Sequence, residues 1–279
     1  MDFKIGVLAD SFRLGAKGGI LKAAELGAQG VQLYATDGEL APENMTRDKI
    51  NEINDIVMSS GLVVSAICGD FAGGGFRNRD QNPWRIEKSK RIMDLALELR
   101  SNIVTTHIGV IPQDDCEMRC IMAQACEQLG VYGDNVGAYF AIETGPEPAL
   151  TLKGFLDSLQ SNAVRVNLDP ANLVMVIGED AAHSAETLKD YIVHTHAKDG
   201  VMLHKTNPEI IYGYMSHENM DSVQNLREVP LGQGQVDFDS YLHTLDKNGY
   251  HGFLTIEREV GADPVQDIKY AIDFLKSKI

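Results

Sequence analysis

Four side chains of the kind that bind divalent metals follow four successive apolar runs in the second half of the sequence. The runs AYFAIE, VRVNLD, YIVHTHA and GFLTIE carry Glu143, Asp169, His196 and Glu257, in that order. Three carboxylates brought together without a cation repel one another, and their pKa values rise. A divalent ion removes that conflict, and three oxygen donors with one imidazole suit Mn²⁺, Mg²⁺, Co²⁺ or Zn²⁺. We therefore predict that these residues bind one divalent metal ion.

Each of the four residues also has an ordinary structural interpretation when it is taken alone. A carboxylate that ends a strand often caps the helix that follows, and Asp169 directly before Pro170 fits an Asx-turn. The metal hypothesis depends on the recurrence of such residues at four successive strand ends.

Further residues are candidates for substrate binding. His107, in TTHIGV, ends a predicted strand and should face the same site, although a buried, hydrogen-bonded histidine would also fit. Asp70 precedes three glycines, which allow either close approach to a ligand or a flexible loop. Lys198 suits an anionic group or a solvated loop. Trp84, the single tryptophan, suits stacking on a sugar or packing at the start of a helix.

Three residues close to the expected ligands are candidates for supporting them. His194 lies two positions before His196, so on a strand both side chains point to the same face. We expect His194 to lie one layer deeper, where support or plain packing is favoured over metal binding. Arg258 and Glu259 follow Glu257 directly and could contact the ligands from outside.

The elements that must position these residues alternate between short β-rich runs and longer stretches of helical spacing, which is typical of βα units. The expected strands are residues 4–9, 30–34, 63–68, 102–107, 138–143, 164–169, 191–197 and 252–257. The expected helices are residues 18–26, 46–60, 118–129, 151–159, 182–189, 238–248 and 264–278, with another that begins at Asn82-Pro83. Residues 199–235 form the largest irregular stretch, and loops of that length are often lids or binding loops.

Eight such units predict a single-domain (β/α)8 TIM barrel over residues 1–279. A closed barrel explains strands that are buried on both faces, whereas an open doubly wound sheet usually has fewer strands. Active sites of such barrels lie at the carboxyl ends of the strands. The fold would therefore bring the four expected ligands to one rim.

Composition limits the partners and the compartment. The chain has 25 Lys and Arg against 40 Asp and Glu, a net charge of −15 that disfavours nucleic acid and anionic membranes. A small phosphorylated substrate stays open, because a local basic site can lie within an acidic field. There is no signal peptide, no long apolar run and no CxxC pair among the four cysteines, so we expect a cytoplasmic protein with reduced thiols. A homo-oligomer is neither predicted nor excluded.

The segments AIETG, VNLDPANL, VHTHAKD and LGQGQVDFDSYLHTLDKNGYHGFLTIERE resemble the sugar phosphate isomerase/epimerase superfamily, which has xylose isomerase-like barrels. The resemblance covers nearly the whole chain and is strongest in its second half. It implies that one catalytic divalent metal is bound by Glu143, Asp169, His196 and Glu257. It also implies that Glu143 and Glu257 act as acid and base on opposite faces of the substrate.

Two positions depart from the pattern of that superfamily. Many relatives carry a histidine three residues after the aspartate, where this chain has Asn172. Asparagine can hydrogen-bond to substrate but cannot exchange protons, which disfavours a second metal. Ketose epimerases tend to carry an arginine six residues after the metal histidine, where this chain has Met202. The sequence therefore does not assign a ketose substrate.

The resulting hypothesis is a metal-dependent isomerase or epimerase of a sugar or sugar phosphate. It would transfer a proton next to a carbonyl and pass through an enediolate. The same site could dehydrate a keto-inositol, because that elimination also begins with loss of a proton beside a carbonyl. A non-catalytic barrel that binds a sugar or metal is a third alternative. Apurinic-site endonucleases share the barrel, but they need additional zinc-binding histidines and a basic groove.

Overall fold

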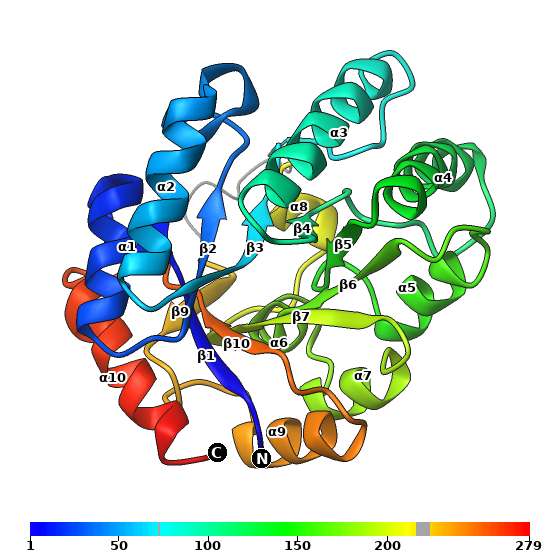
Figure 1. Ribbon diagram of the computed structural model, residues 1–279. Coiled ribbons are helices and arrows are strands. Elements are labelled where there is room, and N and C mark those ends of the chain that lie inside the picture. Colours follow the sequence, from blue (N-terminus) through cyan, green and yellow to red (C-terminus); the bar gives the residue numbers. More distant parts are fainter. Residues whose placement is uncertain (72, 216–223) are drawn as a thin grey trace.

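Eight short parallel strands close into a barrel in the computed structural model, which describes residues 1–71, 73–215 and 224–279 (Figure 1). Around the barrel the strands are ordered β1-β10-β7-β6-β5-β4-β3-β2. Their bounds are β1 Lys4–Leu8, β2 Gly30–Tyr34, β3 Val63–Cys68, β4 Ile103–Thr106, β5 Tyr139–Glu143, β6 Val164–Leu168, β7 Ile192–Ala197 and β10 Phe253–Ile256. The predicted TIM barrel is confirmed.

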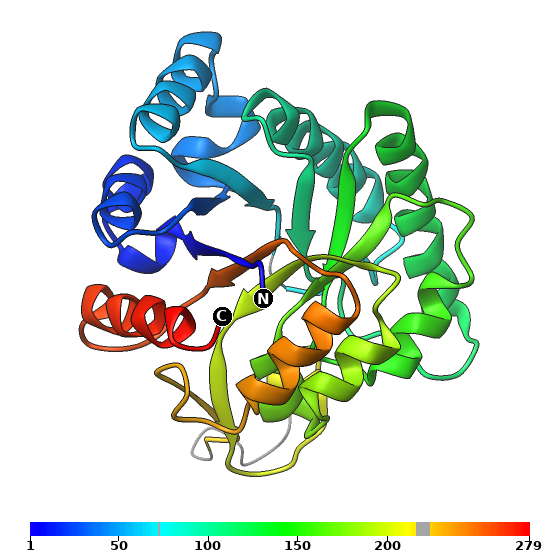
Figure 2. The same ribbon diagram turned by 60° about the horizontal axis from the view of Figure 1, so that its bottom comes forward.

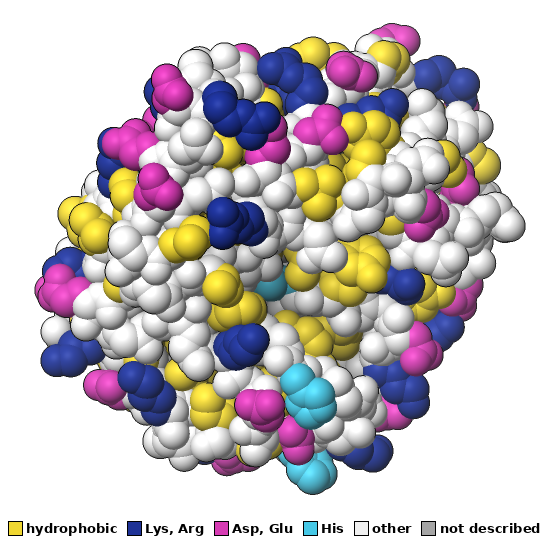
Figure 3. Space-filling model, in the orientation of Figure 1, with side chains coloured by type: hydrophobic (Ala, Val, Ile, Leu, Met, Phe, Trp, Pro, Cys, Tyr) yellow, Lys and Arg dark blue, Asp and Glu magenta, His cyan; other side chains and the backbone are white. Residues whose placement is uncertain are grey.

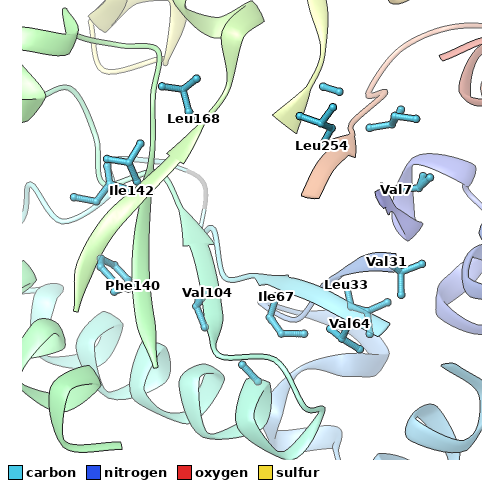
Figure 4. Packing of buried hydrophobic residues seen from close by; sticks show 14 of the residues in the cluster. Val7, Val31, Leu33, Val64, Ile67, Val104, Phe140, Ile142, Leu168 and Leu254 are labelled. Carbon is cyan, nitrogen blue, oxygen red and sulfur yellow. The ribbon is translucent and has the colours of Figure 1, made fainter. Parts of the chain in front are cut away.

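A ring of helices surrounds the barrel (Figure 2). The ring contains α1 Gly15–Glu25, α2 Arg47–Ser59, α3 Asn82–Glu98, α4 Glu117–Val136, α5 Ala149–Leu156, α7 Ala181–Thr187, α9 Phe238–Lys247 and α10 Pro264–Lys276. Strand residues such as Val31, Leu33, Ile67 and Val104 are 0–1% exposed and belong to one continuous apolar cluster (Figure 4). Burial on both faces explains why these strands are almost continuously apolar.

Local chemistry explains where several helices begin. The hydroxyl of Thr46 accepts a hydrogen bond from the backbone N–H of Lys49 and caps α2. Pro83 lies in the first turn of α3, where its missing N–H leaves no hydrogen bond unmade.

Helix α4 continues well beyond its predicted end at residue 129. Gly130 and Gly133 lie inside it, and a Cβ atom at either position would come within 2.4 Å of its neighbours. These glycines let the helix pack closely against the segment before β6 and the one before β5. The helix ends at Gly137, which has a positive φ of 82°.

The predicted irregular stretch 199–235 contains regular structure, so that interpretation is wrong in part. Strands β8 (Asp199–Met202) and β9 (Leu226–Val229) pair antiparallel as a separate ribbon, and the short helix α8 (Pro208–Ile211) lies between them. A helical segment also follows β6, with α6 at Pro170–Asn172 continuing as one π-helical turn at Leu173–Ile177.

The surface carries charges of both signs. On the face drawn in Figure 3, Lys and Arg side chains alternate with Asp and Glu side chains over the outer helices. Within the described ranges, no helix is both long and apolar enough to cross a membrane.

Candidate metal centre and active site

The four predicted ligands meet at the carboxyl rim of the barrel. Glu143 ends β5, Asp169 follows β6, His196 lies near the end of β7 and Glu257 follows β10. Their ligand atoms all lie within 4.8 Å of one another. His196 Nδ1 is 3.5 Å from Glu143 Oε1 and 3.4 Å from both Asp169 Oδ2 and Glu257 Oε2. One nitrogen therefore faces three carboxylates, as a site for one cation requires.

Asp169 shows that this donor set fits a divalent ion. Its Oδ1 accepts a hydrogen bond of 2.9 Å from the backbone N–H of Asn172, which is the capping role expected of an aspartate before proline. Its Oδ2 is buried and has no hydrogen-bond partner among the described residues. A buried carboxylate oxygen without a donor is unfavourable. A divalent cation between Oδ2 and the neighbouring ligands would satisfy it.

Two asparagines orient Glu143. Asn172 Nδ2 donates to Glu143 Oε1 and Asn167 Nδ2 donates to Oε2, each at 3.1 Å. Asn172, for which the sequence predicts a contact to substrate, holds Glu143 through its amide. Asn167 was not predicted to take part.

Electrostatic interactions within the cluster shift its pKa values in opposite directions. Burial alone would raise the pKa of Glu143, but the positive charges of His196 and His107 lower it below its ordinary value. Burial raises the pKa of Glu257 to about 7, although Lys198 and His196 oppose the rise. Burial lowers the pKa of His196, but Glu257 and Glu143 raise it well above its ordinary value. A proton on His196 and a divalent ion would therefore compete for the same position among the carboxylates.

His107 and Asp70 form a pair at the edge of the cluster. His107 Nδ1 is 2.8 Å from Asp70 Oδ2, and its Nε2 is 3.7 Å from Glu143 Oε1. Burial lowers the pKa of His107, but the charges of Glu143 and Asp70 raise it to about 10. Asp70 thus fixes the ring with Nε2 toward the metal ligands.

Lys198 lies on the opposite side of the cluster. Its Nζ is 2.8 Å from Glu257 Oε2 and 2.5 Å from Glu259 Oε2. Glu259 therefore contacts the site through Lys198. Arg258 instead pairs with Glu228 and Asp267, at 2.6 Å and 2.8 Å, and ties β9 to α10.

These groups border a cavity of about 420 Å³ at the mouth of the barrel. The apolar and aromatic part of the lining comes from Leu8, Cys68, Met175, Val176, Ile211, Tyr212 and Leu226. The polar residues of the lining are Tyr34, Asp70, His107, Glu143, Asn172, Lys198, Glu257 and Glu259. Trp84 does not line this cavity. Its side chain is 58% exposed and packs on Phe71, with ring centroids 5.3 Å apart.

Tyr212 is a cavity residue that the sequence analysis missed. It follows α8 in the long excursion between β7 and β10, and its ring lies 5.6 Å from that of His107. The unusual length of residues 199–235 pointed to this segment, but nothing in the sequence indicated which of its residues returns to the barrel.

The chain belongs to the xylose isomerase-like TIM barrel family, whose model matches residues 20–278. Among curated relatives, it is 29% identical over 121 residues to an inosose dehydratase from Clostridium perfringens. That match covers 42% of this chain and 38% of the relative, so the chain spans well under two thirds of the relative's length.

Solved structures show the same fold. A xylose isomerase domain protein from Planctomyces limnophilus has a TM-score of 0.80 at 24% identity, covering 99% of this chain and 96% of that one. A D-allulose 3-epimerase from Methylomonas sp. has a TM-score of 0.74 at 16% identity, covering 100% of this chain and 98% of that one. At these identities the likeness shows a shared barrel.

Proposed function

We propose that this protein is a divalent-metal-dependent isomerase or epimerase of a small polyhydroxy ketone. The observation that carries the proposal is the convergence of Glu143, Asp169, His196 and Glu257 on one point beside a sugar-sized cavity. Two of these residues, Glu143 and Glu257, line the cavity itself. The epimerase among the structural relatives agrees with this chemistry.

Each residue of the cluster has a distinct role in the proposed reaction. Asp169, His196, Glu143 and Glu257 would hold the ion. A bound divalent ion would supply Lewis-acid stabilisation of negative charge next to a carbonyl. Glu257 would remove a proton from the carbon next to that carbonyl, and Glu143 would return one that it takes from protonated His107, whose Nε2 lies 3.7 Å from Glu143 Oε1. Asn167 and Asn172 keep the Glu143 carboxylate aimed at the cavity during this transfer.

The lining favours a substrate without a phosphate group. Lys198 is the one lysine or arginine among the described lining residues, and two carboxylates already neutralise it. Arg77, near the mouth, pairs with Glu209 at 2.7 Å. Residues 72 and 216–223, which lie outside the described ranges, contain no lysine or arginine. A phosphate dianion would therefore meet an acidic cavity in which Lys198 and His107 are already paired with carboxylates.

Dehydration of an inosose is the second candidate. It begins with the same loss of a proton, and the matching inosose dehydratase favours it. The Asp70–His107 pair adds a specific observation, because His107 Nε2 faces the metal ligands and could donate a proton to a departing hydroxyl. Epimerisation conserves mass, whereas dehydration produces a conjugated chromophore, so analysis of the product separates the two reactions.

Substitution of Glu257 tests the proposal directly. Metal-loaded protein is assayed with ketohexoses, inososes and their phosphate esters, and products are followed by NMR and ultraviolet absorbance. Glu257→Gln should lower kcat by roughly 10²–10⁴-fold on any neutral substrate, because the amide cannot accept the proton. The surface variant Glu52→Gln, which keeps all cavity groups, should retain full activity.

Unchanged turnover in Glu257→Gln would contradict the assignment of Glu257 as the base. A bound ligand without turnover across the whole panel would instead indicate the non-catalytic sugar-binding barrel.

A further inference from the structure

A layer of polar side chains fills the barrel directly beneath the metal ligands. Interiors of such barrels are usually packed with branched apolar residues, and buried polar groups are unfavourable unless they are hydrogen-bonded. Here five polar residues from five strands are each at most 1% exposed. They are Gln32 on β2, Thr105 on β4, Asn167 on β6, His194 on β7 and Thr255 on β10. All five are hydrogen-bonded, in one chain that ends at His196 and another that ends at Glu143.

The first chain ends at the metal histidine. Gln32 Nε2 donates to Thr105 Oγ1 at 2.8 Å, which turns the amide oxygen toward β7. Gln32 Oε1 lies 3.0 Å from His196 Nε2. Because a carbonyl oxygen can only accept, His196 Nε2 must carry a hydrogen. The remaining nitrogen, Nδ1, is the one that faces the three carboxylates.

The second chain of hydrogen bonds runs from Thr255 to Glu143. Thr255 Oγ1 donates to His194 Nε2 at 2.9 Å, and His194 Nδ1 donates to Asn167 Oδ1 at 2.8 Å. Asn167 thereby presents its NH₂ group to Glu143 Oε2. Asn167 Nδ2 is also 3.5 Å from His196 Nδ1 and 3.3 Å from His196 Nε2, but an amide NH₂ group only donates, so it cannot accept the hydrogen on Nε2. Gln32 is therefore the residue that determines the protonation pattern of His196.

We propose that Gln32 is a positioning residue that fixes His196 with Nδ1 as the metal-binding nitrogen and Nε2 as the hydrogen donor. The proposal rests on the metal site proposed above. Partners of this kind around a metal-binding histidine hold the ring orientation and typically change metal affinity by 10- to 100-fold when they are removed.

Nitrogen NMR of the wild-type protein tests the geometry without any variant. Selectively ¹⁵N-labelled histidine in the Zn²⁺-loaded protein should show His196 bound through Nδ1, with a hydrogen on Nε2. Binding through Nε2 would overturn the proposal, because the Gln32 amide would then face the wrong nitrogen.

Metal titration of matched variants tests the role of the Gln32 oxygen. Gln32→Met keeps the length of the side chain but removes the acceptor, so Mn²⁺ should bind 10- to 100-fold more weakly. Gln32→Glu keeps an acceptor and should restore most of the affinity. Ser65→Ala is the control, since Ser65 is buried in β3 and its hydroxyl has no hydrogen-bond partner among the described residues.

The outcomes separate this inference from the proposed function. Wild-type affinity in Gln32→Met would overturn the role of Gln32 and leave the metal site standing. A wild-type protein that binds no divalent ion would overturn both.

Discussion

Glu147 is a buried carboxyl group that the proposed chemistry does not use. It is 3% exposed, and its Oε2 accepts a hydrogen bond of 3.1 Å from the backbone N–H of Ile111. Burial raises its pKa to about 8, and the Ile111 N–H and the charges of His107 and Arg119 offset only part of that rise. The group links the loop after β4 to the loop after β5, and it does so as a neutral acid at neutral pH.

This shift predicts a dependence of stability on pH. A carboxyl whose pKa is higher in the folded than in the unfolded state contributes its full stability below the unfolded pKa of about 4.5, and this contribution is lost as the pH rises through about 8. Glu147→Gln keeps an acceptor for Ile111 but cannot ionise. The variant should therefore gain on the order of 2 kcal/mol over the wild type between pH 6 and pH 9. Urea unfolding at both values measures the difference, and parallel pH profiles would contradict it.

The sequence predicts residues of the candidate site more readily at strand ends than inside strands. Glu143 and Glu257 stand out because each ends an apolar run, and the structure does place them together. Gln32 lies in the middle of GVQLY, where a polar residue could equally face a helix or the barrel axis. Its partner His196 is 164 positions away. Only closure of the barrel brings the two together, so no local pattern predicts the contact.

At the scale of elements, two features made the predicted secondary structure incomplete: the glycines inside α4 and the long segment 199–235. Gly130 and Gly133 resemble a helix end in the sequence, yet in the structure they let α4 pack closely on its neighbours. Strands β8 and β9 are only four residues each and pair across a long intervening segment, so neither has a clear β-pattern of its own. The eight barrel strands were predictable because each is a short apolar run that lies between two stretches of helical spacing.

Arg77 contacts the segment that follows β8 and contributes residues to the cavity. Arg77, after β3, pairs with Glu209 of α8 at 2.7 Å and lies 4.7 Å from the ring centre of Tyr214. These contacts flank Ile211 and Tyr212, which line the cavity. Arg77 therefore stabilises the position of these two lining residues.

Substitution of Arg77 should loosen this segment and leave the metal site unaffected. A partly buried ion pair with a cation–π contact contributes about 1 kcal/mol. In Arg77→Met, amide exchange at residues 210–215 should be roughly five-fold faster, with an unchanged Mn²⁺ affinity. Arg79→Met is the matched control, because its pair with Glu117 is mostly exposed. Equal protection in Arg77→Met and wild type would rule out this role.

At the scale of the whole molecule, barrel closure explains why residues distant in sequence form one site. Parallel strands end at the same rim, so β5, β6, β7 and β10 each deliver a ligand to one side of the mouth. Leu226 of β9 and Ile211 of α8 also line the cavity. The net charge of −15 agrees with a cavity in which Lys198 is paired with two carboxylates. The fold itself supports many reactions, so the assignment of chemistry depends on the metal cluster.

The most direct measurement of that cluster is a crystal structure of Mn²⁺-loaded protein with anomalous diffraction data, combined with elemental analysis of the same sample. The account predicts one ion per chain, with Glu143, Asp169, His196 Nδ1 and Glu257 each within about 2.0–2.4 Å of it. Absence of the ion from this position, or ligation by a different set of residues, would contradict the account.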